Sequence, residues 1–155
     1  MNLDTRIEMA RPADSELVAE LVHDLLMEFF SDQCQSFPIA KMKKASAQLL
    51  TPGSGFWSFL AMKNDEIVGV INLNECSAIY AGGKFGEITE LYVKPDFRSQ
   101  YIGGKLIAHA LEFSKGKAWG VLEVGAPDVP RCQRTVNFYL QNGFSEVGPR
   151  LEKDV

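Results

Sequence analysis

The residues between positions 87 and 105 combine acidic side chains, a basic side chain and glycines in an order that could bind an anion. Arg98, Gly103 and Gly104 fall in a turn between a strand-forming run and a helical pattern. A helix start exposes unpaired backbone N–H groups at the positive end of the helix dipole, and glycine lets a bulky anion approach that backbone closely. The turn is therefore predicted to bind an anion, and phosphate is the usual anion at such a site.

Two common phosphate-binding motifs are absent from the sequence. Gly82-Gly83-Lys84 and Gly103-Gly104-Lys105 lack the spacing of a P-loop, and the full GxGxxG dinucleotide fingerprint is missing as well. The predicted anion site therefore belongs to another class of strand–turn–helix unit.

The elements around this turn alternate between strand and helix patterns. Strands are predicted at residues 5–9, 56–63, 67–75, 87–93 and 119–124, with a final, broken strand at 144–147 and 150–152. Helices are predicted at residues 15–30, 39–50, 102–113 and 131–142, the last one ended by Gly143 as its C-cap. Residues 76–84 are expected to form a mobile loop. The order predicts an α/β (α+β) fold with a mixed, mostly antiparallel central sheet of six to seven strands and helices on both faces.

Two motifs carry a resemblance to a known family. Arg98-Ser99-Gln100-Tyr101-Ile102-Gly103 follows a strand that ends Leu91-Tyr92-Val93-Lys94-Pro95, and Asn137-Phe138-Tyr139 is followed by Gly143-Phe144. The first resembles the central motif of the GNAT family of N-acetyltransferases, (Arg/Gln)-x-x-Gly-x-(Gly/Ala), and the second resembles that family's Asn-Phe-Tyr-x-x-x-Gly-Phe signature. The resemblance extends along nearly the whole chain, which is expected to form a single N-acetyltransferase domain over residues 1–155.

The resemblance implies transfer of an acetyl group from acetyl-CoA to an amine. It places the pantetheine arm along the main chain of Leu91, Tyr92 and Val93, and the pyrophosphate on the turn formed by Arg98, Ser99, Gln100, Tyr101, Ile102, Gly103, Gly104 and Lys105. Arg98 would add a fixed charge with forked donors suited to phosphate. Tyr139 is the implied general acid for the leaving thiolate, because a phenol with a pKa of about 10 is protonated at neutral pH. Asn137 either holds the cofactor arm through its amide or only solvates the helix surface.

A carboxylate is needed because an alkylamine, with a pKa of about 10.4, must lose a proton before it can attack. Glu87 and Glu90 both lie on the central strand, and their odd separation predicts opposite faces unless a bulge intervenes. Members of the family carry an acid at either position. We prefer Glu90 as the base, and the other reading of either residue is an acceptor-binding or solvent-facing glutamate.

Tyr101 departs from the family pattern, which has glycine at this position. A Cβ there costs little if φ is negative, and on the order of 1 kcal/mol or more if φ is positive. Because a helix start follows, we expect Tyr101 to have a negative φ, with its ring directed outward and its N–H aimed at phosphate.

Composition excludes several other classes of protein. The chain has 155 residues and a net charge of −4, so a nucleic-acid partner is not expected. Its 3 cysteines, Cys34, Cys76 and Cys132, form neither a metal pattern nor a disulfide framework, and His23 and His109 lack spaced partners, so no metal site is expected. No apolar run approaches membrane-spanning length, the first residues do not resemble a signal peptide, and a cytoplasmic location is expected.

Two functions stay open at this point. The first is an acetyl-CoA-dependent N-acetyltransferase acting on a small-molecule or peptide amine, and the second is a non-catalytic acyl-CoA sensor of the same fold. Polyamines, amino acids, antibiotics and protein N-termini all remain as acceptors, and the acidic balance suits a cationic one. A homodimer is left open beside a monomer.

Overall fold

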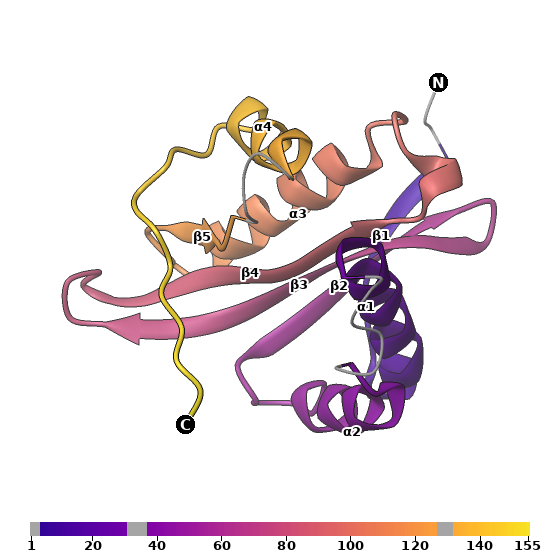
Figure 1. The fold of residues 1–155 in the computed structure, drawn as a ribbon, viewed down its shortest axis with the longest axis horizontal. Helices are drawn as coiled ribbons and strands as arrows, with labels where there is room; N and C mark the ends of the chain where they lie inside the picture. The colour runs from indigo at the N-terminus through magenta and orange to yellow at the C-terminus, as the bar shows by residue number, and fades with distance from the viewer. Residues whose placement is uncertain (1–3, 31–36, 127–131) are drawn as a thin grey trace. The chain divides into compact units, whose positions relative to one another are not determined.

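The computed structural model describes residues 4–30, 37–126 and 132–155 (Figure 1). It divides into two compact units, residues 1–123 and residues 124–155. The strands are β1 (Thr5–Met9), β2 (Phe56–Lys63), β3 (Glu66–Ala78), β4 (Gly83–Val93) and β5 (Leu122–Val124), and they form one sheet in the order β1-β2-β3-β4-β5. The helices are α1 (Ser15–Phe29), α2 (Ile39–Leu49), α3 (Ile102–Gly116) and α4 (Gln133–Gln141).

Strands β1 to β4 form an antiparallel meander with helices on both of its faces (Figure 1). On one face, Leu60 and Val70 pack in a buried cluster with Val18 and Leu21 of α1. On the other face α3 covers the sheet, and the ring of Phe59 lies 5.0 Å from that of Phe113. Because both faces are covered, β2 and β3 are almost continuously apolar, which is the expected pattern for a strand buried on two sides. The predicted mixed α/β fold is confirmed.

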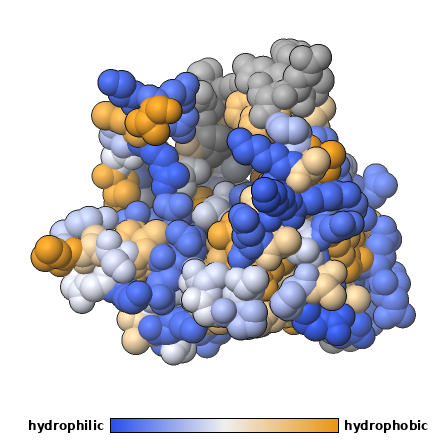
Figure 2. Space-filling model, turned by 90° about the horizontal axis from the view of Figure 1, so that it is seen from below, coloured by the Kyte–Doolittle hydropathy of each residue, from blue (hydrophilic) through white to orange (hydrophobic). Residues whose placement is uncertain are grey.

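The expected mobile loop at residues 76–84 is wrong, because β3 and β4 continue through most of it. Ser77 pairs with Lys84 and Ala78 pairs with Gly83, which leaves only a tight turn between the strands. Positive φ at Gly82 and Gly83 allows this turn, so the glycines that indicated a loop close a hairpin instead. Ile79 at its tip is fully exposed, and Figure 2 shows apolar atoms at this end of the molecule, at the left of the view.

The predicted final strand is also wrong, and the part of the chain that the structure describes has a sheet of five strands in place of the expected six to seven. Residues 144–155 contain no strand in the structure, and Pro149, which lacks a backbone donor, lies in the middle of the segment. The strand predicted at residues 119–124 is shortened to β5. Trp119 lies before β5 and packs on Gly86 of β4, where an added Cβ would lie 2.4 Å from the indole ring. Glycine is therefore required at position 86.

The predicted helices are confirmed with small shifts at their ends. α1 and α2 each end one residue earlier than expected, and α3 runs three residues beyond residue 113. α4 is described from Gln133, and the predicted start at residue 131 lies outside the described residues, as does Cys34. Within the helices that the structure describes, none is long and apolar enough to span a membrane.

Candidate active site

A β-bulge in β4 places Glu87 and Glu90 on the same face of the sheet. Glu87 pairs with Asn74 and Glu90 pairs with Asn72, and the register shifts between Asn72 and Leu73 of β3. Asn72 and Asn74 are two residues apart and therefore share a face, and directly opposed residues share it with them. The sequence analysis named a bulge as the exception to its rule. The expectation that Glu87 and Glu90 lie on opposite faces is therefore corrected. The face is the one covered by α1, because Val70 on it packs against that helix.

The carboxylate of Glu90 is held by a chain of polar side chains from three strands. Asn72 Nδ2 donates to Glu90 Oε2 at 2.9 Å, and the hydroxyl of Thr89 donates to the same oxygen. Ser58 Oγ on β2 in turn donates to Asn72 Oδ1 at 2.5 Å. Ser58 and Asn72 are buried, with 0% and 2% of their surface exposed. The sequence analysis did not identify Ser58 or Asn72, although a polar residue inside each apolar strand run could have indicated them.

The rest of β4 and the residues after it form a second polar group. Arg98 NH1 and NH2 donate to the two oxygens of Glu28 at 2.8 and 2.6 Å, and Arg98 Nε donates to the carbonyl of Val93 at 2.9 Å. The Arg98 guanidinium lies 5.6 Å from the centre of the Tyr92 ring. The Arg98 guanidinium, which was expected to face a pyrophosphate, is thus bound to Glu28 at the end of α1. Glu28, which sequence reasoning missed, has no local signal because its partner lies 70 residues away.

This ion pair changes the pKa of both partners. The hydrogen bonds from Arg98 lower the pKa of Glu28, against a smaller opposing effect of burial, and the same bonds raise the pKa of Arg98. Burial, followed by the nearby negative charges of Glu28 and Asp24, raises the pKa of Tyr92. Arg98 therefore carries its charge at any accessible pH and ties β4 to α1.

Glu28→Gln is expected to lower the free energy of unfolding at neutral pH by about 1 kcal/mol or less, because both side chains are more than one third exposed. The pKa of Glu28 is lower in the folded chain, so this stabilisation is present above the unfolded value of 4.5 and is lost as the pH falls through the folded value. Urea unfolding at about pH 7 and about pH 3.5 measures it. Glu112→Gln, in an exposed pair with Lys115, is the control. An equal loss at both pH values would contradict the prediction.

The turn between β4 and α3 presents the start of a helix, as predicted. The N–H of Lys105 makes the first bond of the helix, to the carbonyl of Tyr101 at 3.0 Å. Helix geometry leaves the N–H groups of Ile102, Gly103 and Gly104 without an intrahelical acceptor. Lys63 Nζ donates to Gln100 Oε1, which attaches the turn to the end of β2. Ser99 and Tyr101 both have positive φ, of 61° and 63°.

Tyr101 does not have the negative φ expected from the sequence. It is the N-cap of α3 with φ of 63° and ψ of 14°, in the left-handed region, and its side chain is 82% exposed. The backbone therefore takes the conformation that the family's glycine permits, with a Cβ added to it. The ring points outward, as expected.

Tyr101→Gly is expected to raise the free energy of unfolding by about 0.5–1 kcal/mol, because the left-handed conformation costs a residue with a Cβ more than it costs glycine. Affinity for the acetyl-CoA that the family resemblance implies should change less than tenfold, about 1.4 kcal/mol, because the turn keeps its conformation. Chemical denaturation and calorimetry measure the two effects. Ala108→Gly, an exposed position within α3, should instead destabilise the chain. A hundredfold gain in affinity would show that Tyr101 obstructs the site.

Tyr139 and Asn137 lie on α4, in the second unit. The helix ends in a Schellman motif, in which Phe144 N–H donates to the carbonyl of Tyr139 and Gly143 N–H donates to that of Leu140, both at 3.1 Å. The predicted C-cap at Gly143 is confirmed, with φ of 90°. The ring of Phe144 packs back on Tyr139 at 5.4 Å.

Burial decides the state of the Tyr139 phenol. The residue is buried, and burial raises its pKa well above the ordinary value of 10.0, so the hydroxyl is protonated at neutral pH. Asn137 is exposed, and its side-chain oxygen accepts a hydrogen bond from Gln133 Nε2 at 2.9 Å. This bond agrees with the alternative in which Asn137 only solvates the surface of the helix.

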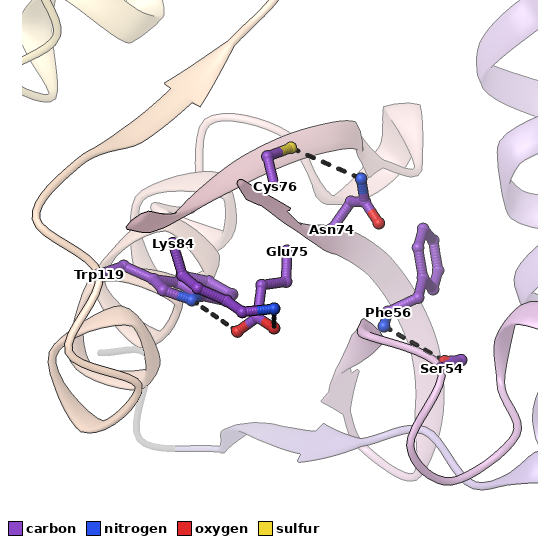
Figure 3. Close-up of polar contacts among 7 residues, drawn as sticks. All are labelled: Ser54, Phe56, Asn74, Glu75, Cys76, Lys84 and Trp119. Carbon is purple, nitrogen blue, oxygen red and sulfur yellow. Dashed lines mark hydrogen bonds and ion pairs between the residues drawn. The ribbon is translucent and has the colours of Figure 1, made fainter. Parts of the chain in front are cut away.

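The polar contacts at the hairpin end of the sheet are structural (Figure 3). Trp119 Nε1 donates to Glu75 Oε2 at 2.9 Å, and Lys84 Nζ lies 3.1 Å from Glu75 Oε1. The hydrogen bond from Trp119, with a smaller effect of Lys84, lowers the pKa of Glu75. The ring of His109 packs on Phe59, with 4.7 Å between the ring centres. No group of three metal-ligating side chains occurs among the described residues.

Comparison with known proteins agrees with this geometry. Residues 19–144 match the acetyltransferase (GNAT) family, a stretch that runs through both units. The chain is 32% identical over 108 residues to an aminoalkylphosphonate N-acetyltransferase of Salmonella typhimurium, covering 70% of this chain and 68% of the relative. The chain therefore belongs to the GNAT family and is an acetyltransferase.

Solved structures show the same fold at low identity. An aminoglycoside acetyltransferase from an uncultured soil metagenomic sample superposes with a TM-score of 0.77 at 21% identity, covering 98% of this chain and 97% of that one. A possible acetyltransferase from Clostridium difficile 630 superposes with a TM-score of 0.80 at 16% identity, covering 97% of each chain.

Proposed function

We propose that the chain transfers the acetyl group of acetyl-CoA to the primary amine of a small molecule or peptide, by direct attack through a tetrahedral intermediate. The observation that carries the proposal is the bulge in β4, which turns Glu87 and Glu90 to one face of the strand that leads into the phosphate-type turn. A strand with carboxylates on one face, followed by a helix start rich in N–H donors, supplies both a proton acceptor and an anion site.

In this proposal the turn binds the cofactor mainly through its backbone. The N–H groups of Ile102, Gly103 and Gly104 would hold the pyrophosphate, together with the donors at Ser99, Gln100, Tyr101 and Lys105. Arg98 contributes indirectly, because its fork is bound to Glu28 and its Nε to the Val93 carbonyl. The main chain of Leu91 to Val93 would pair with the pantetheine arm. The side-chain amide of Asn137 would make a second contact to the same arm.

The reaction needs two proton transfers by side chains. Glu90 takes a proton from the acceptor's ammonium, and the neutral amine then attacks the thioester carbonyl carbon. Collapse of the tetrahedral intermediate breaks the carbon–sulfur bond and expels the thiolate of CoA, which receives a proton from Tyr139. The phenol carries the proton for this step at neutral pH, and burial, which raises its pKa, makes it a weaker acid than a free tyrosine. The attacking nitrogen gives up its second proton to solvent. Solvent then takes the proton from Glu90 and returns a proton to Tyr139.

The class of acceptor is inferred from the two carboxylates of the site and from the substrates for which similar proteins are named. Two carboxylates on one face suit a cationic amine. The similar protein of Salmonella typhimurium is named for an aminoalkylphosphonate and the soil-metagenome structure for an aminoglycoside, both small-molecule amines. A small-molecule amine is therefore the first acceptor to test. The single domain over residues 1–155, the cytoplasmic location and the choice between monomer and homodimer stay predictions.

The test measures release of CoA thiol from acetyl-CoA with a panel of amines that includes aminoalkylphosphonates, aminoglycosides, polyamines and peptides. Acetyl-CoA should also raise the melting temperature by binding the native state, about 2.7 kcal/mol of stabilisation at one hundred times its Kd. A melting shift without thiol release on any amine would favour the acyl-CoA sensor. A shift with another nucleotide and none with acetyl-CoA would overturn both.

A further inference from the structure

The turn between β4 and α3 contains two residues in a backbone conformation that their side chains disfavour. Ser99 has a φ of 61° and Tyr101 has a φ of 63°. The left-handed region brings the Cβ of an L-residue close to a backbone carbonyl oxygen, so such residues keep this conformation only where the surrounding structure holds them in it. Both side chains are exposed. Packing of these two side chains therefore does not explain the conformation.

Gln100, which lies between these two residues, is attached to the sheet. Its side chain is half-buried, and Lys63 Nζ donates to its Oε1. Gln100 Nε2 lies 3.5 Å from the carbonyl oxygen of Asp96. Lys63 is the last residue of β2, and it pairs with Thr5 on one side and with Glu66 on the other. A hydrogen bond from a charged donor, on a strand that is paired on both sides, thus reaches the middle of the turn.

Other contacts fix the two ends of the turn. Arg98 Nε donates to the carbonyl of Val93 at 2.9 Å, where the turn leaves β4. The N–H of Lys105 donates to the carbonyl of Tyr101 at 3.0 Å, where the turn enters α3. The bond from Lys63 acts between these two points, beside both left-handed residues.

We propose that Lys63 is a positioning residue for the cofactor: by holding Gln100 it keeps Ser99 and Tyr101 left-handed, so the N–H groups of the turn are arranged for an anion before acetyl-CoA binds. The role in binding rests on the proposed function. Apparent affinity falls in proportion to the fraction of molecules that have the binding conformation, so a turn that is held in advance binds more tightly. Lys63 acts through the amide of Gln100 and not by contact with the cofactor.

Lys63→Met tests this inference, because it removes the ammonium group and keeps a long unbranched side chain. Acetyl-CoA should bind about tenfold more weakly by calorimetry, as expected if about one molecule in ten keeps the turn in place. The KM for acetyl-CoA should rise by a similar factor with kcat unchanged, since the side chains that transfer protons are intact. Lys63→Thr, with a residue suited to strands, is the second variant if Lys63→Met does not fold.

Tyr101→Gly, added to Lys63→Met, separates positioning from direct contact. Glycine takes a positive φ without the cost of a Cβ, so the turn depends less on Lys63. The double variant should bind acetyl-CoA within about threefold of the wild type, a non-additive recovery that shows coupling between the two positions. A double variant that binds no better than Lys63→Met would overturn the inference, because Lys63 would then act by contact with the phosphates.

Lys94→Met is the matched control. The ammonium of Lys94 lies 3.6 Å from Glu66 Oε1, so this variant removes a positive charge at the same end of the sheet and leaves the bond to Gln100 in place. Because the pair is partly exposed, acetyl-CoA affinity should stay within about twofold of the wild type. An equal loss of affinity in the two lysine variants would show that charge alone matters, and would overturn the inference.

NMR of the free protein separates this inference from the proposed function. The amide and α protons of one residue are closest at positive φ, so the cross-relaxation between them in Ser99 and Tyr101 should be strong in the wild type and weaker in Lys63→Met. Such a weakening, with no acetyl-CoA binding by the wild type, would uphold the positioning of the turn and overturn the proposed function. Binding by the wild type, with unchanged cross-relaxation in Lys63→Met, would uphold the function and overturn the role of Lys63.

Discussion

Tyr139→Phe is expected to lower kcat by about ten- to a thousandfold with little change in acetyl-CoA affinity. The phenol is buried and burial raises its pKa, so it is protonated at neutral pH, the state in which it can give a proton to the thiolate. Phenylalanine keeps the ring that packs on Phe144 and removes only the hydroxyl. Stopped-flow and steady-state thiol release, with calorimetry of acetyl-CoA binding, measure the two quantities.

The control for this variant is Tyr80→Phe, which removes the same hydroxyl from a largely exposed ring at the β3–β4 turn. It should leave kcat, affinity and melting temperature at their wild-type values. Wild-type turnover by Tyr139→Phe would mean that water protonates the thiolate. Tyr139 would then act only as the aromatic partner of Phe144 in the helix cap.

Glu90→Gln is expected to lower kcat/KM at neutral pH by about a hundred- to ten-thousandfold, the usual contribution of a general base. Glutamine keeps the shape of the side chain and cannot accept a proton. The defect should shrink as the pH rises toward the acceptor's own pKa of about 10.4, because a growing fraction of the amine is then neutral without help. A pH series of kcat/KM measures this convergence.

Glu87→Gln is the matched variant, since Glu87 lies on the same face of the same strand. Its effect should appear mainly in the KM of a cationic acceptor, with the pH profile unchanged in shape. If Glu87→Gln shows the steep, pH-dependent loss and Glu90→Gln does not, the roles of the two carboxylates are exchanged.

Features with a local cause were predictable from the sequence. β2 has the bounds expected from its apolar run, and α2 begins at Ile39, directly after Pro38, as predicted. Gly143 caps α4, and this was predictable because the helix-ending pattern Asn-Gly-Phe involves only neighbouring residues. The central strand over residues 87–93, the turn after it and the start of the helix at Ile102 were also readable, since the change of hydrophobic period and the glycines lie within one stretch.

Features that depend on a distant partner were not predictable in this way. The ion pair of Arg98 is one of these, because nothing near Arg98 in the chain indicates Glu28, 70 residues away. The support of Glu90 by Asn72 depends on the register between β3 and β4, which the bulge sets after the strands have paired. Tyr101 took a left-handed conformation because the turn around it fixes φ, against the preference of its own side chain.

The bulge at Thr89 also bears on how this strand can change during evolution. Positions 87 and 90 point to the same side although they are three positions apart, so an acid can move from one position to the other without crossing the sheet. A lineage could lose the carboxylate at one position after gaining it at the other and pass through an ancestor that carries both. This chain, with glutamate at each position, has the composition of such an ancestor.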